Sequence, residues 1–429
     1  MMQETPVTLD SHLPAVGAHE GEGGASYARP RAFDAGVRSS RVFSLDVLRG
    51  VAIVLVLVRH MPEGAASSGA AAFFYQIGWT GVDLFFVLSG YLISGLLYGE
   101  ADATGKIRVG RFWLRRGLKI WPSYFACYGG WVLSKLTADL ATGGGAKIAA
   151  RLKAALPNLI FIQNYVGRDG AWPHSWSLAI EEHFYLALPL LFLAAYALSK
   201  RRPLAVLPYA AGAVCLAAFC LRLWAYWGGA RDWESFYYPT HMRADALAFG
   251  VLLGYAHRYQ REKFRAVGRA WPWLLALSVP LIATAAVFPL TDSPFSYLAG
   301  FTLLYLAYGG LVAAAGTHPN FGSRLTVTRA LAWLGVYSYT IYLAHSVVRR
   351  LLFVSVFTER LVRGNVWADR VMFWTLSIAG GVALSHAVER PFLRLRSRLF
   401  PSRGEAAAPA RVEFHVEPPA AVGQAAQAG

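Results

Sequence analysis

Residues 80–98 read TGVDLFFVLSGYLISGLLY, and this stretch decides the fold. A transmembrane helix needs about 20 consecutive apolar residues, and the stretch has that length with Asp83 as its one charged side chain. Gly81, Gly90 and Gly95 permit the close approach of neighbouring helices. The stretch therefore predicts a helix that crosses a membrane inside a packed bundle.

The composition of the whole chain leads to the same conclusion. Of its 429 residues, 55% are hydrophobic and 15% are charged, and the mean hydropathy is +0.38. Soluble proteins carry about a quarter charged residues, so an ordinary soluble protein is excluded, as are the disordered, collagen-like and disulfide-rich classes. Cys127, Cys215 and Cys220 lie in apolar stretches and indicate neither a disulfide framework nor a Cys-based metal site, and we expect no metal.

Nine further apolar segments lead us to predict an all-α, polytopic membrane helix bundle of about ten transmembrane helices with disordered N- and C-terminal tails. The predicted spans are 44–62, 80–98, 119–137, 177–199, 203–225, 242–257, 271–289, 297–315, 331–352 and 366–388. Residues 1–43 are predicted to be a disordered cytoplasmic arm, 44–395 the membrane domain, and 396–429 a basic and then disordered cytoplasmic tail. The amphipathic segment 147–163 is too broken to span and is placed on the outer interface.

The distribution of cations predicts the topology. The 41 Lys and Arg against 25 Asp and Glu give a net charge of +16. With both termini on one side of ten spans, that side receives 26 Lys and Arg and the other side 10. Cytoplasmic loops carry the excess of cations, so both termini are predicted to be cytoplasmic. The charge thus indicates topology and contact with membrane lipids, with no nucleic acid as a partner.

Two ionisable side chains lie within the first predicted span. Arg49 and His60 are eleven residues apart, which places them about 20° from the same helix face and about 16 Å apart along it. Ionisable groups inside a membrane are costly and point to function. The alternative is that Arg49 extends to the inner headgroups while His60 packs near the outer interface.

A basic cluster lies where the chain enters the third predicted span. It contains Arg111, Arg115, Arg116 and Lys119 within nine residues. Lys and Arg beside a span are usually topology signals, and from this segment alone that is the favoured interpretation.

Adjacent carboxylates stand at the outer start of the fourth predicted span. Glu181 and Glu182 follow Trp176 and Ser177. Neighbouring carboxylates repel each other at a membrane boundary, which is typical of a functional site. The alternative is a helix cap, with Ser177 as N-cap and Glu181 favoured by the helix dipole.

Two more predicted spans carry ionisable residues near their outer ends. Arg243 and Asp245, in the sixth, form either a structural ion pair or an acceptor-binding element. His345 lies in the outer half of the ninth span, beside Tyr339 and Tyr342, and a buried histidine with satisfied hydrogen bonds is the favoured interpretation from the residues alone.

Seven motifs follow one another along the chain. They are SLDVLRGVAIVLVLVRH (44–60), GVDLFFVLSGYLI (81–93), RRGLKIWP (115–122), SWSLAIEEHFYLALP (175–189), HMRADALAFGVLLG (241–254), YSYTIYLAHS (337–346) and ERPF (389–392). In this order, over residues 43–395, the chain resembles the acyltransferase-3 family of bacterial membrane acyltransferases, which modify sugars and some antibiotics. The resemblance favours a functional pair of Arg49 and His60.

The resemblance implies an O-acyltransferase, most simply an O-acetyltransferase, in the bacterial inner membrane. The implied donor is acetyl-CoA or another acyl-CoA, and the implied acceptor is a carbohydrate of the cell envelope or an exported carbohydrate, free or lipid-linked. The phosphates of the donor need cations at the inner face, where Arg115, Arg116 and Lys119 lie. Arg49, a turn or two deeper, would hold the pyrophosphate or the pantetheine arm.

The resemblance also assigns the chemistry. His60 would accept the proton of the acceptor hydroxyl as a general base, and Glu181 or Glu182 would orient His60 or bind the sugar. A covalent acyl-histidine is the alternative. The candidate acceptor-binding residues are Asp83, Trp176, Ser177, Arg243 and His345.

One motif departs from the family pattern. The family reads Arg-x-x-Arg where this chain has Arg116-x-x-Lys119, and lysine keeps the charge but lacks the bidentate fork. Only about 40 residues follow the last span, so we expect a stand-alone membrane unit without an appended hydrolase-like domain. The alternatives for function are acylation of an antibiotic or lipid, or a transporter, although no inverted repeat supports the latter.

Overall fold

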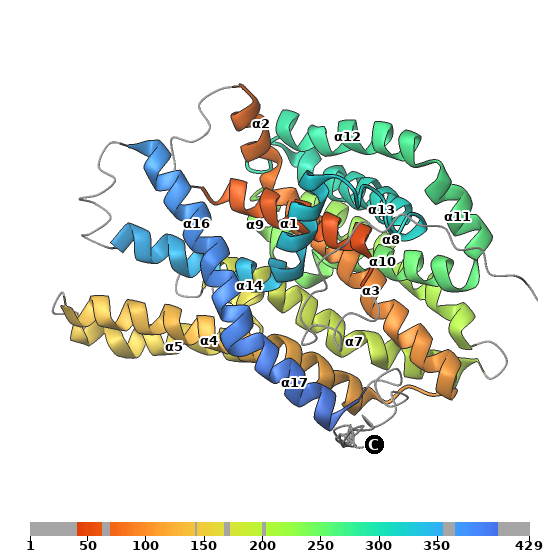
Figure 1. Cartoon of the computed structure of the whole chain (residues 1–429), viewed down its shortest axis with the longest axis horizontal. Coiled ribbons are helices and arrows are strands. Elements are labelled where there is room, and N and C mark those ends of the chain that lie inside the picture. The colour runs from red at the N-terminus through yellow and green to blue at the C-terminus, as the bar shows by residue number, and fades with distance from the viewer. Residues whose placement is uncertain are drawn as a thin grey trace, which may run out of the picture. The chain divides into compact units, whose positions relative to one another are not determined.

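The computed structural model describes residues 41–61, 69–141, 144–166, 172–199, 203–354 and 365–401. All regular secondary structure within these ranges is helical (Figure 1), so the predicted all-α class is confirmed there. Residues 1–40 of the predicted arm and 402–429 of the predicted tail lie outside the described residues.

Each of the ten predicted spans falls on a long helix. These helices are α1 (Phe43–Arg59), α3 (Gly81–Thr104), α4 (Val109–Ala141), α7 (Trp176–Leu198), α8 (Leu207–Trp227), α10 (Thr240–Tyr259), α12 (Trp271–Val287), α13 (Phe301–Thr317), α14 (Thr326–Val354) and α16 (Val366–Leu384). Shorter helices are α2 (Gly69–Ile77), α5 (Ile148–Leu159), α6 (Gln163–Val166), α9 (Glu234–Tyr237), α11 (Arg261–Arg269) and α17 (Arg390–Leu399).

Several of these helices are long and apolar enough to cross a membrane. The five that qualify by length and composition are Gly69–Thr104, Trp176–Leu198, Pro203–Trp227, Ser296–Thr317 and Val366–Leu399. Helices α11 and α12 meet at a bend of 71° and add a sixth if the pair is one span. These helices indicate a membrane protein, while the total of ten spans stays a prediction.

Glycines allow two pairs of helices to cross closely in the core. A Cβ atom on Gly50 of α1 would lie 1.9 Å from the carbonyl oxygen of Leu331 on α14. A Cβ atom on Gly90 of α3 would lie 2.0 Å from the carbonyl oxygen of Leu247 on α10. Backbones that approach this closely leave no room for a side chain, as is common where membrane helices pack.

Two buried ion pairs tie α10 to its neighbours. Arg243 pairs with Asp83 of α3 at 2.6 Å, and Asp245 pairs with Arg222 of α8 at 2.7 Å, with all four side chains at most 1% exposed. Arg243 and Asp245 were considered as one ion pair from sequence, but each pairs with a different helix. The reason is geometric, since residues two apart project about 200° from each other around a helix.

The amphipathic segment 147–163 forms α5, the turn that follows it and the first residue of α6. Helix α5 runs alongside the distal half of α4 (Figure 1), and Tyr128 of α4 donates a hydrogen bond to the carbonyl oxygen of Ala155 at 2.6 Å. Leu152 and Leu156 are 48% and 57% exposed. This apolar exposure agrees with the prediction of an interfacial helix, whose position in a membrane stays a prediction.

Candidate active site

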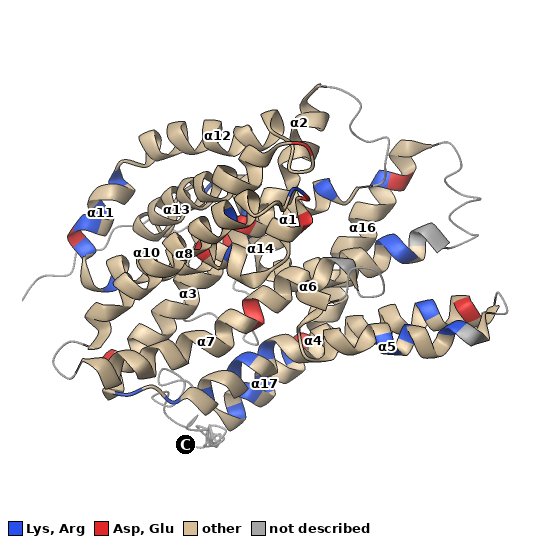
Figure 2. Cartoon of the chain, turned by 180° about the vertical axis from the view of Figure 1, so that it is seen from behind, with Lys and Arg blue, Asp and Glu red and all other residues tan. Residues whose placement is uncertain are grey.

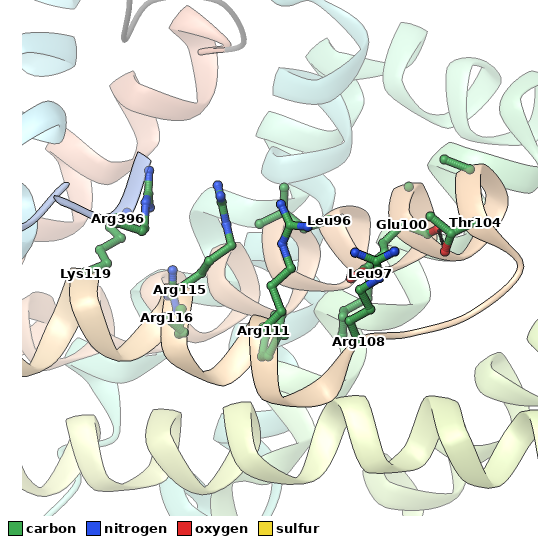
Figure 3. A pocket seen from close by; sticks show the side chains of 13 residues that line it. Leu96, Leu97, Glu100, Thr104, Arg108, Arg111, Arg115, Arg116, Lys119 and Arg396 are labelled. Carbon is green, nitrogen blue, oxygen red and sulfur yellow. Dashed lines mark hydrogen bonds between the residues drawn. The ribbon is translucent and has the colours of Figure 1, made fainter. Parts of the chain in front are cut away.

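A basic pocket of about 370 Å³ lies between the end of α3, the start of α4, and α17. Figure 3 shows its cationic side chains projecting from the α4 side toward the pocket, and Figure 2 shows basic residues gathered on α4 and α17. The pocket is lined by six cations, Arg108, Arg111, Arg115, Arg116, Lys119 and Arg396. Six cationic side chains around one cavity can bind a polyanion through charge-assisted hydrogen bonds.

The sequence located part of this pocket. Arg115, Arg116 and Lys119 were predicted to lie together and do so. Arg108 and Arg396 were missed. Arg108 could have been recognised because residues 108, 111, 115 and 119 follow helical spacing on one face. Arg396 had no local signal, since it comes from the other end of the chain.

Arg49 lies outside the lining of the basic pocket among the described residues. Its guanidinium pairs with Asp46, one turn earlier on α1, at 2.8 Å, and its side chain is 27% exposed. The structure therefore places Arg49 in a local ion pair near the start of α1. The predicted role of Arg49 in donor binding stays a prediction.

A line of polar side chains leads from the basic pocket to the glutamates of α7. Arg116 donates a hydrogen bond to the hydroxyl of Tyr185 at 2.7 Å, and Tyr185 donates to the hydroxyl of Ser89 at 3.3 Å. Ser89 donates to a carboxylate oxygen of Glu181 at 2.6 Å. We call Arg116, Tyr185, Ser89 and Glu181 the polar line. Glu182 accepts a hydrogen bond from the indole of Trp121 at 3.0 Å.

Three histidines meet where α1 ends. The ring centroid of His60 is 4.3 Å from that of His174 and 4.9 Å from that of His345, and those of His174 and His345 are 5.2 Å apart. We call these residues the histidine cluster. His60 and His345 were predicted as site residues, and the structure brings them together. His174 was missed, and its one signal in the sequence is its place directly before the SWSLAIEE motif.

Hydrogen bonds to the backbone fix two of these rings. Nδ1 of His60 bonds to the carbonyl oxygen of Val56 at 2.8 Å, and Nδ1 of His345 bonds to that of Tyr342 at 2.5 Å. Both Nδ1 atoms must donate, because a carbonyl oxygen only accepts, and Nε2 of each ring therefore carries the lone pair. Burial, with His345 and Arg349 nearby, lowers the pKa of His174 well below its ordinary value, so this imidazole is neutral near pH 7.

An aromatic cavity of about 200 Å³ borders the histidine cluster. Its lining includes His60 and His174 together with Trp79, Trp176, Trp233, Tyr237, Tyr238 and Tyr342. Trp176, a predicted acceptor-binding residue, thus lies in a cavity. Ser177 does not line it, but its hydroxyl bonds to that of Tyr342 at 2.6 Å, and Tyr342 in turn donates to the carbonyl oxygen of His174 at 2.7 Å.

Asp83 and Arg243, two further predicted acceptor-binding residues, are held by each other behind the aromatic cavity. The guanidinium of Arg243 lies 3.7 Å from the ring centroid of Phe301 and 5.0 Å from that of Tyr237, a cavity residue. Neither Asp83 nor Arg243 is among the residues that line the cavity. This geometry suits support of the cavity wall.

Comparisons with known proteins agree with the motifs. A family model described as an acyltransferase domain matches residues 42–390. The peptidoglycan O-acetyltransferase OatA of Listeria monocytogenes serovar 1/2a is 28% identical over 323 residues, which cover 70% of this chain and 48% of OatA. The putative peptidoglycan O-acetyltransferase YrhL of Bacillus subtilis is 27% identical over 312 residues, which cover 70% of this chain and 47% of YrhL.

A putative O-acetyltransferase of Staphylococcus aureus (strain COL) is 25% identical over 323 residues, which cover 71% of this chain and 50% of the relative. The chain thus spans about half the length of these curated relatives. No solved structure matches it. The family model covers most of the chain, including α1 with His60, the basic segment of α4 and the three segments of the histidine cluster, and the protein is a member of the acyltransferase-3 family.

Proposed function

We propose that this protein is an integral membrane O-acetyltransferase that moves an acyl group from acyl-CoA to a hydroxyl of a cell-envelope or exported carbohydrate. The observation that carries the proposal is that the helix bundle contains two cavities of different chemistry. One cavity is basic, and the other is aromatic and borders the histidine cluster. The family and the names of the relatives support transfer of an acetyl group.

The basic pocket is assigned to the donor. Coenzyme A carries a pyrophosphate and a further phosphate, and Arg and Lys bind such groups through charge-assisted hydrogen bonds. The polar line then continues from Arg116 toward the interior of the bundle over 2.7, 3.3 and 2.6 Å steps. It offers hydrogen-bonding groups to the pantetheine arm, whose amides would otherwise be buried without partners. The basic end faces the cytoplasm in this assignment, as the cation distribution predicts.

Transfer is assigned to His60. The acceptor oxygen forms a bond to the thioester carbonyl carbon while Nε2 of His60 takes the hydroxyl proton, and the carbon–sulfur bond then breaks. The proton on His60 passes to the thiolate, so that the products are the O-acyl carbohydrate and free CoA. The bond from Nδ1 to Val56 leaves Nε2 as the lone-pair nitrogen that this step requires.

The two glutamates are assigned to the route of the donor. Glu181 is bound by Ser89, and Glu182 by Trp121. The carbonyl of Val56, and not a carboxylate, accepts from Nδ1 of His60. Glu181 and Glu182 thus have partners on α3 and α4 that fit a position beside the thioester, whereas the orienting role expected from the resemblance is filled by the backbone.

The aromatic cavity is assigned to the acceptor. The faces of sugar rings stack on aromatic side chains, and the cavity presents three tryptophans and three tyrosines next to His60. OatA and YrhL are named as acting on peptidoglycan, so a cell-wall glycan is the first acceptor to test. An antibiotic or a lipid with an accessible hydroxyl is the alternative acceptor.

The experiment is acyl transfer by purified protein in nanodiscs, with radiolabelled acetyl-CoA and soluble peptidoglycan fragments. His60→Ala should reduce product formation by about 100-fold or more, the range of a positioned general base, while CoA binding stays unchanged. His386→Ala is the matched control, since His386 is exposed and lines neither cavity, its Nδ1 bonds to the carbonyl oxygen of Val382, and its ring stacks on Tyr337 at 5.9 Å. Near-normal transfer by a folded His60→Ala protein would refute the assignment of the base.

The same assay separates an enzyme from a transporter. An acyltransferase releases CoA thiol only when a hydroxyl acceptor is present, whereas a carrier releases none. Labelled product with peptidoglycan fragments but not with a control polyol would support a cell-wall acceptor. Thiol release with other hydroxyl acceptors alone would redirect the substrate assignment.

A further inference from the structure

The histidine cluster has the arrangement of a metal site. One ring nitrogen from each of His60, His174 and His345 can be chosen so that the three atoms lie within 4.8 Å of one another. Three imidazole nitrogens around a tetrahedral Zn²⁺, each at about 2.0–2.1 Å, are about 3.4 Å apart. The three nitrogens must therefore approach one another by less than about 1.5 Å to bind the ion.

The outer contacts of the rings favour such a site. Metal-binding histidines almost always donate the second ring N–H to a carbonyl or carboxylate, which fixes the other nitrogen as the ligand. His60 and His345 both do this, through Val56 and Tyr342. Nε2 of the fully buried His345 and Nδ1 of His174 have no hydrogen-bond partner among the described residues. Unpartnered buried nitrogens are uncommon and call for an explanation.

We propose that His60, His174 and His345 bind a borderline transition-metal ion of the Zn²⁺ class, which enters through the aromatic cavity. His60 and His174 line that cavity, so the ion reaches the site from there and keeps its fourth position toward it. The cluster contains no carboxylate within the described residues, and Arg349 donates to the carbonyl oxygen of His60 at 3.2 Å. The positive charge of Arg349 repels a bound cation, so we expect weaker metal binding here than at a site with a carboxylate ligand.

Occupancy has a consequence for catalysis, and this part rests on the proposed function. A metal ion bound to Nε2 of His60 occupies the lone pair that would accept the hydroxyl proton. Metal binding and general-base catalysis are therefore mutually exclusive, and Zn²⁺ should inhibit transfer. A metal ion that instead stimulated transfer would overturn this inhibitory role.

The binding test uses purified protein in nanodiscs, with the affinity tag removed and with no CoA or other thiol present. Co²⁺ is the probe, because tetrahedral Co²⁺ gives an intense visible spectrum, and Zn²⁺ should displace it. The wild type and the control His386→Gln should bind one Co²⁺ tetrahedrally. His174→Gln should weaken binding by more than about 100-fold, beyond the 10–100-fold that loss of an outer contact produces.

Two safeguards keep the test decisive. His345→Gln serves as a second variant, and each variant must match the wild type in circular dichroism and gel filtration. Absence of a tetrahedral spectrum in the wild type, or unchanged Co²⁺ affinity in both folded variants, would overturn the metal site. Inhibition by Zn²⁺ is measured as O-acetyl product, since free CoA thiol itself binds zinc. If no acetyl transfer is found at all, Co²⁺ binding still decides the metal site separately from the proposed function.

Discussion

The buried pair of Asp83 and Arg243 provides a stringent test of the bundle. Asp83→Asn keeps the shape of the side chain but removes the charge that faces Arg243 at 2.6 Å, where the two side chains are 1% and 0% exposed. Breaking a buried ion pair by removing one partner costs about 3–5 kcal/mol, because the remaining charge stays buried without compensation. At about 1.4 kcal/mol per factor of ten, the folded population should fall relative to the unfolded one by roughly 10²–10³·⁵.

The exposed pair of Asp102 and Arg258 is the matched control. Its separation is also 2.6 Å, but the side chains are 30% and 40% exposed. Solvent screens such pairs, so Asp102→Asn should cost less than about 1 kcal/mol. The double variant Asp83→Asn with Arg243→Gln should recover much of the lost stability, since no unpaired charge remains.

The measurement is the free energy of unfolding in mixed detergent micelles, read from the fraction of native protein as the denaturing detergent increases. The same preparations are tested for binding of peptidoglycan fragments. If Asp83→Asn is as stable as Asp102→Asn but loses acceptor binding, the pair belongs to the acceptor site and the reasoning about a buried structural pair is refuted.

Three further predictions concern the donor, the topology and the packing. Arg116→Ala should weaken CoA binding by about 1.5–3 kcal/mol in equilibrium titrations, and unchanged affinity would reduce the basic cluster to a topology signal. In a cysteine-free background, a cysteine at position 170 should react with an impermeant reagent from outside and one at position 106 should not, with the reverse pattern overturning the orientation. Gly90→Ala should cost about 1–3 kcal/mol of stability, because its Cβ would lie 2.0 Å from a carbonyl oxygen, whereas Gly99→Ala, with nothing within 4 Å, should cost none.

The helical segments could be predicted because each carries its own signal. A run of about 20 apolar residues predicts a membrane-spanning helix from local sequence alone. All ten predicted segments fall on helices. Part of the basic pocket could be predicted for the same reason, because Arg115, Arg116 and Lys119 are neighbours in sequence. Where a residue and its partners share one helix, the periodicity of that helix is enough.

Contacts between side chains of different helices could not be predicted from the periodicity of one helix. His60, His174 and His345 come from three distant segments, and no pattern in any one of them reveals that their rings meet. The partners of Arg243 and Asp245 could not be predicted either, because the sequence of one helix does not show which neighbouring helix a charged side chain faces. Tertiary packing decides such pairs, and it becomes visible only when the bundle is assembled.

The polar line also has a consequence for the permeability of the membrane to ions. A row of hydrogen-bonding groups through a membrane protein is a route for protons and metal cations, and leakage along it would dissipate the gradients that the membrane maintains. Arg116 stands at the basic end of this row with Lys119 and four further cations around the pocket. Pore-lining arginines exclude protons and other cations by electrostatic repulsion. The charges around the basic pocket should therefore also repel small cations from this end of the polar line.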